Sequence, residues 1–270
     1  MKALLFIIPL LLILSSCEMT KEIDYSTENY TPKLVTHGYI SPQDGIQVIL
    51  KTTTNPSSIS EDDKPLNPEV KIYNDKGEYI ELDYTTNNLF TSDSTNFINS
   101  NRQYSIQAKA DNFTSITSTK QHILDTPIID SVSITETNTT RAYIHFNNNY
   151  ADDVRFFINV YPYNNGTIDP IYIDSEKFNP FSMLDNINVG NNTVEISTSF
   201  YEYDSLLVEL YVLSPDLVKF LTSQDNYDYS KEDPFYPQPY PVFSNITGGY
   251  GIFASYSYTS TIVNISRKWD

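Results

Sequence analysis

The sequence predicts an all-β protein made of two sandwich-like domains, with one short helix in the second domain. Three observations predict this fold class. Apolar and more polar residues alternate over many short runs, which is typical of half-buried strands. Turn-forming residues separate these runs at the spacing of hairpins. The start signals of a helix converge on one stretch, which begins at Ser214.

The amino terminus has the features of a bacterial lipoprotein signal. After Lys2, residues 3–14 form an uncharged apolar run that is too short to cross a bilayer as a helix. The run ends in Leu-Ser-Ser followed by Cys17, which resembles a lipobox, and Cys17 is the only cysteine of the chain. We therefore expect residues 1–16 to be a signal peptide and Cys17 to be the lipid attachment site. The alternative is an ordinary cleavage site followed by an incidental cysteine.

Acylation of Cys17 predicts a permanent membrane anchor, because two or more acyl chains hold a protein stably in a bilayer. Residue 18 is Glu, whereas lipoproteins retained in the inner membrane commonly carry Asp there. This favours the outer membrane, with the protein facing the periplasm or the cell exterior. Residues 17–32 are polar and acidic, so they are predicted to be a flexible tether.

Residues 33–124 are predicted to form the first domain, which resembles an immunoglobulin or fibronectin module. The clearest alternating runs are 46–51, 70–73 and 104–109, and turn residues fall at 41–45, 74–77 and 110–112. The longer acidic link at 55–68 is predicted to be a solvated loop.

A second β domain is expected over residues 125–270, because Asp125-Thr126-Pro127 is a polar break that precedes a fresh alternating run. Its predicted strands are 141–146, 154–161, 193–199, 205–213, 252–258 and 261–265.

The predicted helix lies in this second domain and runs from Ser214 to about Ser223. Ser214 is a suitable N-cap, Pro215 fits the first helical position, and Asp216 favours the positive end of the helix dipole. An apolar stripe follows at positions 217, 220 and 221.

Residues 224–240 are rich in Tyr and Pro and are predicted to form an extended loop over the second domain, because proline cannot pair in a central strand. Aromatic rings on a stiff backbone offer a large contact area at low entropic cost. The candidate contact residues for a partner or ligand are therefore Tyr227, Tyr229, Tyr236 and Tyr240. The alternative is that these rings seal the core of the second domain.

The charge of the chain excludes nucleic acid as a partner. Its 34 acidic and 17 basic residues give a formal charge of −17, whereas binding to a polyanion needs a basic surface. The mature body is likewise expected to be repelled by anionic lipids, so the predicted membrane contact is through Cys17.

Motifs of catalysis and metal binding are missing from the sequence. It contains no nucleophile elbow, phosphate loop or zinc motif, and its three histidines, at 37, 122 and 145, are far apart. The acidic groups at 61–63 and 152–153 could bind calcium weakly, but solvated loops are the simpler interpretation. We expect no catalytic residues, no metal and no cofactor, so the protein is not expected to be an enzyme.

Both ends of the chain resemble one family. The motifs are Cys17, Lys-Glu-Ile-Asp at 21–24, Pro-Lys-Leu-Val-Thr-His-Gly-Tyr-Ile at 32–40 and the run from Asp233 to Ser257 that contains Gly-Gly-Tyr-Gly at 248–251. In these motifs the chain resembles the lipoproteins of domain of unknown function 4249. The resemblance implies an outer-membrane lipoprotein that is often encoded beside a TonB-dependent transporter, and it supplies no catalytic residues.

Two functions follow as expectations. The first is a binding or accessory module for a TonB-dependent nutrient-uptake system, with a transporter as partner and a glycan or peptide as ligand. The alternative is a structural or adhesive protein of the cell surface.

Overall fold

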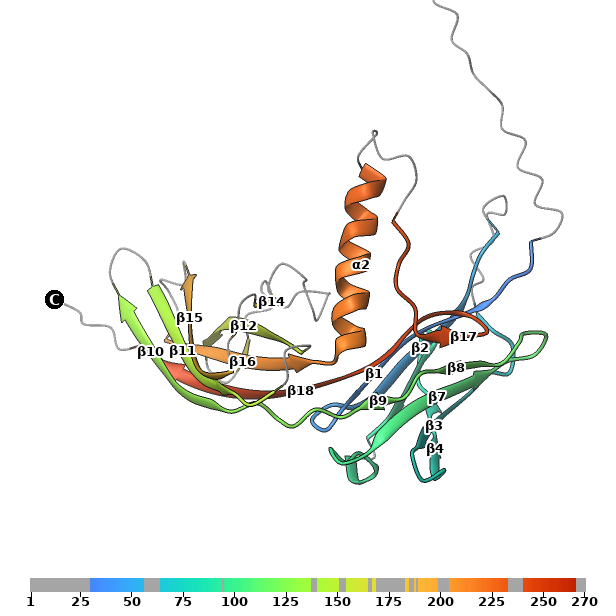
Figure 1. Cartoon of the computed structure of the whole chain (residues 1–270), viewed down its shortest axis with the longest axis horizontal. Coiled ribbons are helices and arrows are strands. Elements are labelled where there is room, and N and C mark those ends of the chain that lie inside the picture. The colour runs from blue at the N-terminus through green and yellow to red at the C-terminus, as the bar shows by residue number, and fades with distance from the viewer. Residues whose placement is uncertain are drawn as a thin grey trace, which may run out of the picture.

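A computed structural model describes residues 30–55, 64–93, 95–136, 140–150, 154–164, 167–168, 183–184, 187, 189–198, 204–232 and 240–265. The predicted signal peptide, Cys17, nearly all of the predicted tether and Tyr236 lie outside these residues. The described part of the chain is mostly β, with several sheets and one α-helix (Figure 1). The predicted fold class is therefore confirmed.

The largest sheet has nine strands and extends along the molecule (Figure 1). In order across the sheet, eight of them are β13 (Thr167–Ile168), β12 (Arg155–Asn164), β16 (Ser205–Leu213), β18 (Tyr250–Asn264), β1 (Leu34–Ser41), β2 (Gly45–Thr52), β6 (Leu89–Ser92) and β5 (Asp83–Tyr84). The ninth, β14 (Met183–Leu184), also pairs with β12.

Two smaller sheets complete the sandwiches. The six-stranded sheet has the order β17 (Ile246–Thr247), β8 (Ile116–Ser118), β7 (Gln103–Lys109), β3 (Glu69–Asn74) and β4 (Tyr79–Glu81), with β9 (Gln121–His122) also paired to β7. The three-stranded sheet has the order β10 (Ile129–Glu136), β11 (Thr140–Asn148) and β15 (Gly190–Thr198). A short 3-10 helix, η1 (Thr95–Phe97), precedes β7.

Each sandwich has its own core. The first core joins alternate residues of β1 and β2 to those of β3 and β7, for example Val48 and Ile72, which are fully buried. The second core joins β12 and β16 to β11, for example Val208 and Ile144. The period-two pattern seen in the sequence therefore marks the buried faces.

Strand β18 belongs to both sandwiches. Residues 250–255 pair in parallel with β1, whereas residues 256–264 pair antiparallel with β16. Phe253 accordingly lies in the first core although it follows the second domain in sequence. A division of the chain into 33–124 and 125–270 therefore cuts through a continuous sheet, and the boundary predicted near Asp125 stays a prediction.

The structure also corrects the prediction of two separate terminal strands at 252–258 and 261–265. Thr259 and Ser260 look like a break in the sequence, but they pair with Leu210 and Glu209 in the middle of the β16 ladder. The result is one strand of 15 residues.

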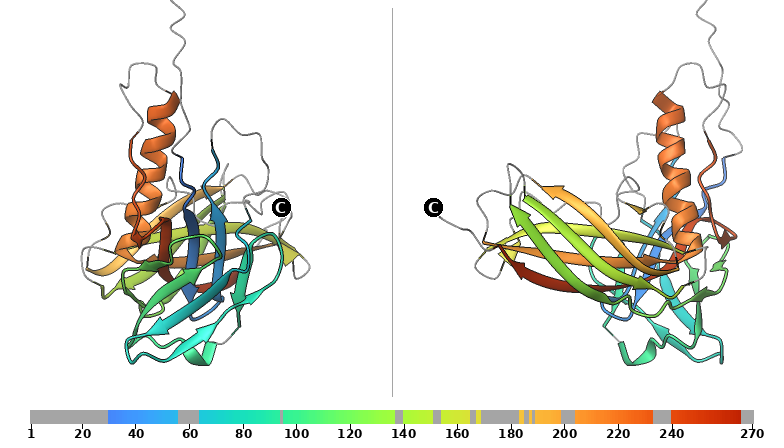
Figure 2. Two further views of the ribbon diagram at one scale, coloured as in Figure 1. Left: turned by 90° about the vertical axis from the view of Figure 1, so that its right-hand side faces the viewer. Right: turned by 60° about the vertical axis from the view of Figure 1, so that its left-hand side comes forward.

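The helix α2 (Pro215–Glu232) begins where it was predicted but ends nine residues later than expected. The prediction of an extended loop over 224–240 is thus wrong for residues 224–232. The prolines that suggested the loop begin only at Pro234, and residues 224–232 contain neither Pro nor Gly to end the helix. In both views of Figure 2, α2 stands out from the sheets.

A third core lies under the helix. Leu217, Phe220 and Leu221 of α2 pack on Ile252 and Ala254 of β18. These β18 residues alternate with Phe253, so α2 covers the face of β18 opposite to the first core.

Candidate functional site

The candidate site is a pocket of about 480 Å³ beside α2. Its walls come from the helix, from the segment that returns from the helix to the sheet (residues 240–244, here called the return segment) and from the starts of β1 and β18. The lining residues are Val35, His37, Phe220, Gln224, Tyr227, Asp228, Val242, Phe243, Ser244, Tyr250 and Gly251. A pocket of this size suits a small ligand or the side chains of a partner.

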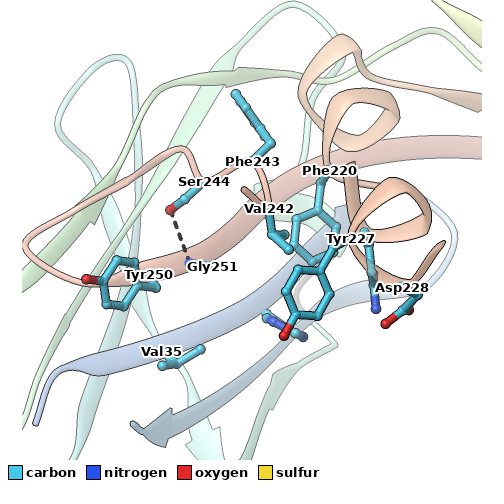
Figure 3. A pocket seen from close by; sticks show the side chains of 11 residues that line it. Val35, Phe220, Tyr227, Asp228, Val242, Phe243, Ser244, Tyr250 and Gly251 are labelled. Carbon is cyan, nitrogen blue, oxygen red and sulfur yellow. Dashed lines mark hydrogen bonds between the residues drawn. The ribbon is translucent and has the colours of Figure 1, made fainter. Parts of the chain in front are cut away.

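One face of α2 forms the first wall. Phe220, Gln224, Tyr227 and Asp228 are spaced i, i+4, i+7 and i+8, so they lie on the same side of the helix. The ring of Phe220 meets His37 edge-on, with 5.4 Å between the ring centroids. Figure 3 shows Phe220 and Tyr227 on one side of the pocket and Tyr250 and Val35 on the other.

Two serines fix the return segment against the helix. The backbone N–H of Tyr240 donates to Ser230 Oγ at 2.8 Å, and the N–H of Phe243 donates to Ser223 Oγ at 2.7 Å. Both hydroxyls in turn donate to carbonyl oxygens one turn back in α2. These bonds hold the return segment antiparallel to the helix and keep Val242 at the pocket.

Side chains close the edge of β18 that faces the helix and the return segment. The N–H groups of Gly251, Phe253 and Ser255 donate at 3.1, 3.0 and 3.3 Å to the side-chain oxygens of Ser244, Asn245 and Ser214, respectively. The carbonyl of Phe253 accepts from Asn245 Nδ2 at 2.8 Å, and the carbonyl of Ser255 accepts from the Ser214 N–H at 3.1 Å. Main-chain groups that would otherwise lie unpaired at a strand edge are thereby satisfied.

Glycines permit β18 to lie beside β1. A Cβ at Gly249 would lie 2.3 Å from the carbonyl oxygen of Leu34, and a Cβ at Gly251 would lie 1.9 Å from that of Thr36. Gly251 also has a φ of +113°, a conformation that side chains disfavour. The Gly-Gly-Tyr-Gly motif is thus explained by close backbone packing.

A carboxylate at the base of the helix joins three elements. Asp216 accepts hydrogen bonds from Thr119 Oγ1 at 3.2 Å, Gln121 Nε2 at 2.8 Å and Asn245 Nδ2 at 3.0 Å. Burial alone would raise the pKa of Asp216, but these donors and nearby Lys219 outweigh it, so the pKa is lowered. The charged carboxylate therefore ties the start of α2 to the first sandwich and to Asn245, which directly follows the return segment.

The interior of the pocket carries little net charge. Burial, together with nearby Lys51, lowers the pKa of His37, so its imidazole is neutral at pH 7. Asp228 forms an ion pair with Lys231 at 3.5 Å, and the Lys231 ammonium lies 5.4 Å from the centre of the Tyr227 ring.

Lys33 has a similar position on the opposite rim. Its ammonium donates to the hydroxyl of Tyr250 at 3.3 Å and lies 4.9 Å from the centre of that ring. The two tyrosine rings of the pocket thus each have a lysine of the protein beside them.

A second tyrosine cluster is structural. Tyr256 and Tyr258 donate to the carboxylate of Asp44 at 2.6 and 3.1 Å, and Tyr211 stacks on Tyr258 at 4.8 Å between ring centres. Burial and the Asp44 charge raise the pKa of Tyr258 to about 12. Because Asp44 lies in the turn between β1 and β2, this cluster links the first sandwich to β16 and β18.

The four tyrosines predicted as contacts have different positions. Tyr227 lines the pocket. Tyr229 and Tyr240 are 65% and 50% exposed but do not line it, and Tyr236 lies outside the described residues. The interpretation that these rings seal the core does not fit Tyr229 or Tyr240.

Other pocket residues could not be predicted from the sequence. Its patterns indicate only an ordinary strand residue at His37 and a member of a core stripe at Phe220. The signal that could have placed Phe220 beside Tyr227 is their spacing of seven, which has meaning only once the helix is known to continue past Ser223.

Neither a metal centre nor a membrane-spanning helix is found in the part of the chain that the structure describes. Among these residues, no group of three His, Cys, Asp or Glu side chains could hold a metal ion. Within the same ranges, no helix is both long and apolar enough to cross a bilayer.

Fold and pocket together define a mostly β protein with an aromatic pocket between a helix and a shared sheet. Residues 20–262 match the model of the family described as "Domain of unknown function (DUF4249)". The chain therefore belongs to this family.

Comparisons with individual proteins do not extend the family assignment. The sequence matches no curated protein. A similar solved structure is that of a DUF4785 family protein from Legionella pneumophila subsp. pneumophila str. Philadelphia 1, with 12% sequence identity and a TM-score of 0.28. The match covers 67% of this chain and 52% of that protein, so the chain spans about half its length. A TM-score this low does not establish a shared fold.

Proposed function

We propose that this protein is a lipid-anchored binding module of the outer membrane that serves a TonB-dependent nutrient-uptake system. The observation that carries the proposal is the pocket beside α2, in which Tyr227, Tyr250 and Val242 offer apolar surface. Tyr250 is 50% exposed and Val242 is 40% exposed. Exposed apolar groups that line a concave site are typical of ligand and partner contacts.

The place of the pocket in the chain supports a role near the membrane. Val35 lines the pocket, and it lies five residues after Tyr30, where the described body begins. The 13 residue steps from Cys17 to Tyr30 span at most about 47 Å when fully extended. An anchor at Cys17 would therefore keep the pocket within reach of a partner in the same membrane.

The anchor is tested by metabolic labelling with a fatty-acid analogue. The wild-type protein is expected to be labelled and to fractionate with outer membranes. Cys17→Ser should be unlabelled, and it should be released in soluble form or remain as uncleaved precursor. An unlabelled wild-type protein would remove the anchor from the proposal.

The partner is tested by crosslinking native outer membranes and purifying the protein. A TonB-dependent transporter should co-purify with the wild type, and Tyr227→Ala combined with Tyr240→Ala should weaken this. Tyr79→Ala is the matched control, because Tyr79 is 53% exposed on β4 of the six-stranded sheet. Equal recovery of the transporter with all variants would mean that the contact lies elsewhere. Absence of any transporter, with loss of surface adhesion on gene deletion, would favour the structural or adhesive alternative.

A further inference from the structure

We infer that the pocket beside α2 binds an uncharged carbohydrate of one or two sugar rings. This inference rests on the proposed binding function and specifies the ligand class of the same site. Four features of the pocket carry it: its rings, its polar side chains, its charge balance and the closed edge of β18.

The rings supply flat apolar surfaces on two sides. Tyr227 comes from the helix, beside Phe220, which is only 4% exposed, and Tyr250 comes from the sheet across the pocket (Figure 3). A pyranose ring has apolar C–H faces and a hydroxylated rim, so it can place its faces against such side chains and its rim against polar groups. Aromatic walls that converge with a few polar groups are the common design of small-ligand sites.

The polar side chains match hydroxyl groups. Gln224 provides two N–H donors and a carbonyl acceptor, Asp228 provides carboxylate acceptors, and neutral His37 provides one donor and one acceptor. A sugar hydroxyl both donates and accepts, so it can pair with each of these groups.

Charged ligands fit the pocket poorly. The net charge of −17 on the whole chain disfavours an anion. A cation would compete with the protein itself, because Lys231 already pairs with Asp228 and lies near the Tyr227 ring. Lys33 has the equivalent position beside Tyr250.

A peptide that binds as an added strand is disfavoured by the sheet. The N–H groups of Gly251, Phe253 and Ser255 and the carbonyls of Phe253 and Ser255 are already bonded to the protein. On its other side β18 pairs with β1, and β1 pairs with β2. These main-chain groups already have hydrogen-bond partners within the protein, so a ligand in this pocket must be recognised by side chains.

The test is titration calorimetry of the full lipoprotein, held in a detergent without a sugar headgroup, against maltose, cellobiose and N,N′-diacetylchitobiose. At least one of these neutral disaccharides should bind. Tyr227→Ala should weaken that binding about tenfold or more, as loss of a central aromatic contact does. Tyr79→Ala should leave the affinity within about twofold.

A second variant keeps the test decisive if Tyr227→Ala fails to fold. Gln224→Ala replaces an exposed helical residue and should weaken binding about threefold or more while the circular dichroism spectrum stays unchanged. Binding that is unaffected by both variants overturns the assignment of the pocket.

Failure of all three saccharides to bind overturns the assignment of the ligand as a carbohydrate. Tight binding of a short peptide that depends on Tyr227 overturns it as well. If transporter recovery still depends on Tyr227 and Tyr240 in that case, the proposed function stands and only its ligand class falls.

Discussion

Asn245→Ala is expected to destabilise the protein strongly, because this one side chain satisfies two main-chain groups of a central strand. Asn245 is 7% exposed, and it accepts from the Phe253 N–H at 3.0 Å and donates to the Phe253 carbonyl at 2.8 Å. Each buried polar group left without a partner costs about 1–3 kcal/mol, and the lost bond to the charged Asp216 adds about 1.5 kcal/mol. Allowing for partial access of water, we expect a loss of about 3–5 kcal/mol.

The assay is urea-induced unfolding followed by circular dichroism, with stability taken by linear extrapolation. Asn226→Ala is the matched control, because Asn226 is exposed on α2, where alanine favours the helix. Its stability should change by less than about 0.5 kcal/mol. A loss below about 1 kcal/mol for Asn245→Ala would show that the edge of β18 does not depend on this side chain, and it would refute the role of Asn245 in closing that edge.

Three further predictions concern the same region. Gly251→Ala should prevent soluble expression of folded protein, because its Cβ would overlap the backbone of β1. Gly77→Ala, where an added Cβ meets nothing within 4 Å, should lower the free energy of unfolding by only about 1 kcal/mol. Soluble expression and equal stability of the two variants would contradict the close-packing argument. The pKa of Asp216 is lowered in the folded state, so the ionised carboxylate contributes to the free energy of unfolding at neutral pH. This contribution is lost as the pH falls below about 4. Asp216→Asn should therefore be less stable than wild type in urea unfolding at pH 7, and the gap should narrow at about pH 3; a constant gap would contradict the ionised role. Replacing both Ser223 and Ser230 by Ala should speed proteolysis of the return segment without changing the β content, and unchanged cleavage would contradict their role in holding it.

The strands could be predicted because their cause is local. In β2, Ile46, Val48 and Leu50 are buried and the residues between them are exposed, so the period of two is written directly in the sequence. The start of α2 was equally predictable from Ser214 and Pro215. These signals depend on neighbouring residues and not on the rest of the fold.

The end of the helix could not be predicted in the same way. Residues 224–232 contain three acidic side chains and two tyrosines, which suggested a loop when read together with the prolines that follow. Their helical conformation is supported by tertiary contacts: Ser223 and Ser230 each bind the return segment. Packing of this kind routinely overrides a weak local propensity.

The pocket depends on contacts between residues that are distant in sequence. His37 lies beside Phe220 because β1 pairs in parallel with β18 and α2 packs on β18. A parallel pairing between segments so far apart in the chain leaves no periodic signal in the sequence, so neither His37 nor Tyr250 could be assigned to the site in advance.

Several residues of the carboxy-terminal motif at 233–257 support the fold. The strand β18, which joins the two sandwiches, depends on hydrogen bonds from Ser244 and Asn245 and on the close backbone packing at Gly249 and Gly251. A substitution at any of these four positions is therefore expected to lower the stability of the protein.

Three pocket-facing residues of α2 have no such structural role in the sheet, since Gln224 and Asp228 are exposed and Tyr227 is only partly buried. The fourth, Phe220, is buried in the third core. For the proposed ligand, preference can therefore change through these three residues while the motif keeps the sheet intact. A variant that exchanges Gln224 and Asp228 with each other should unfold at the wild-type urea concentration yet change its ligand selectivity in calorimetry. If the variant instead unfolds at a lower urea concentration and also loses binding, this face of the helix is part of the fold.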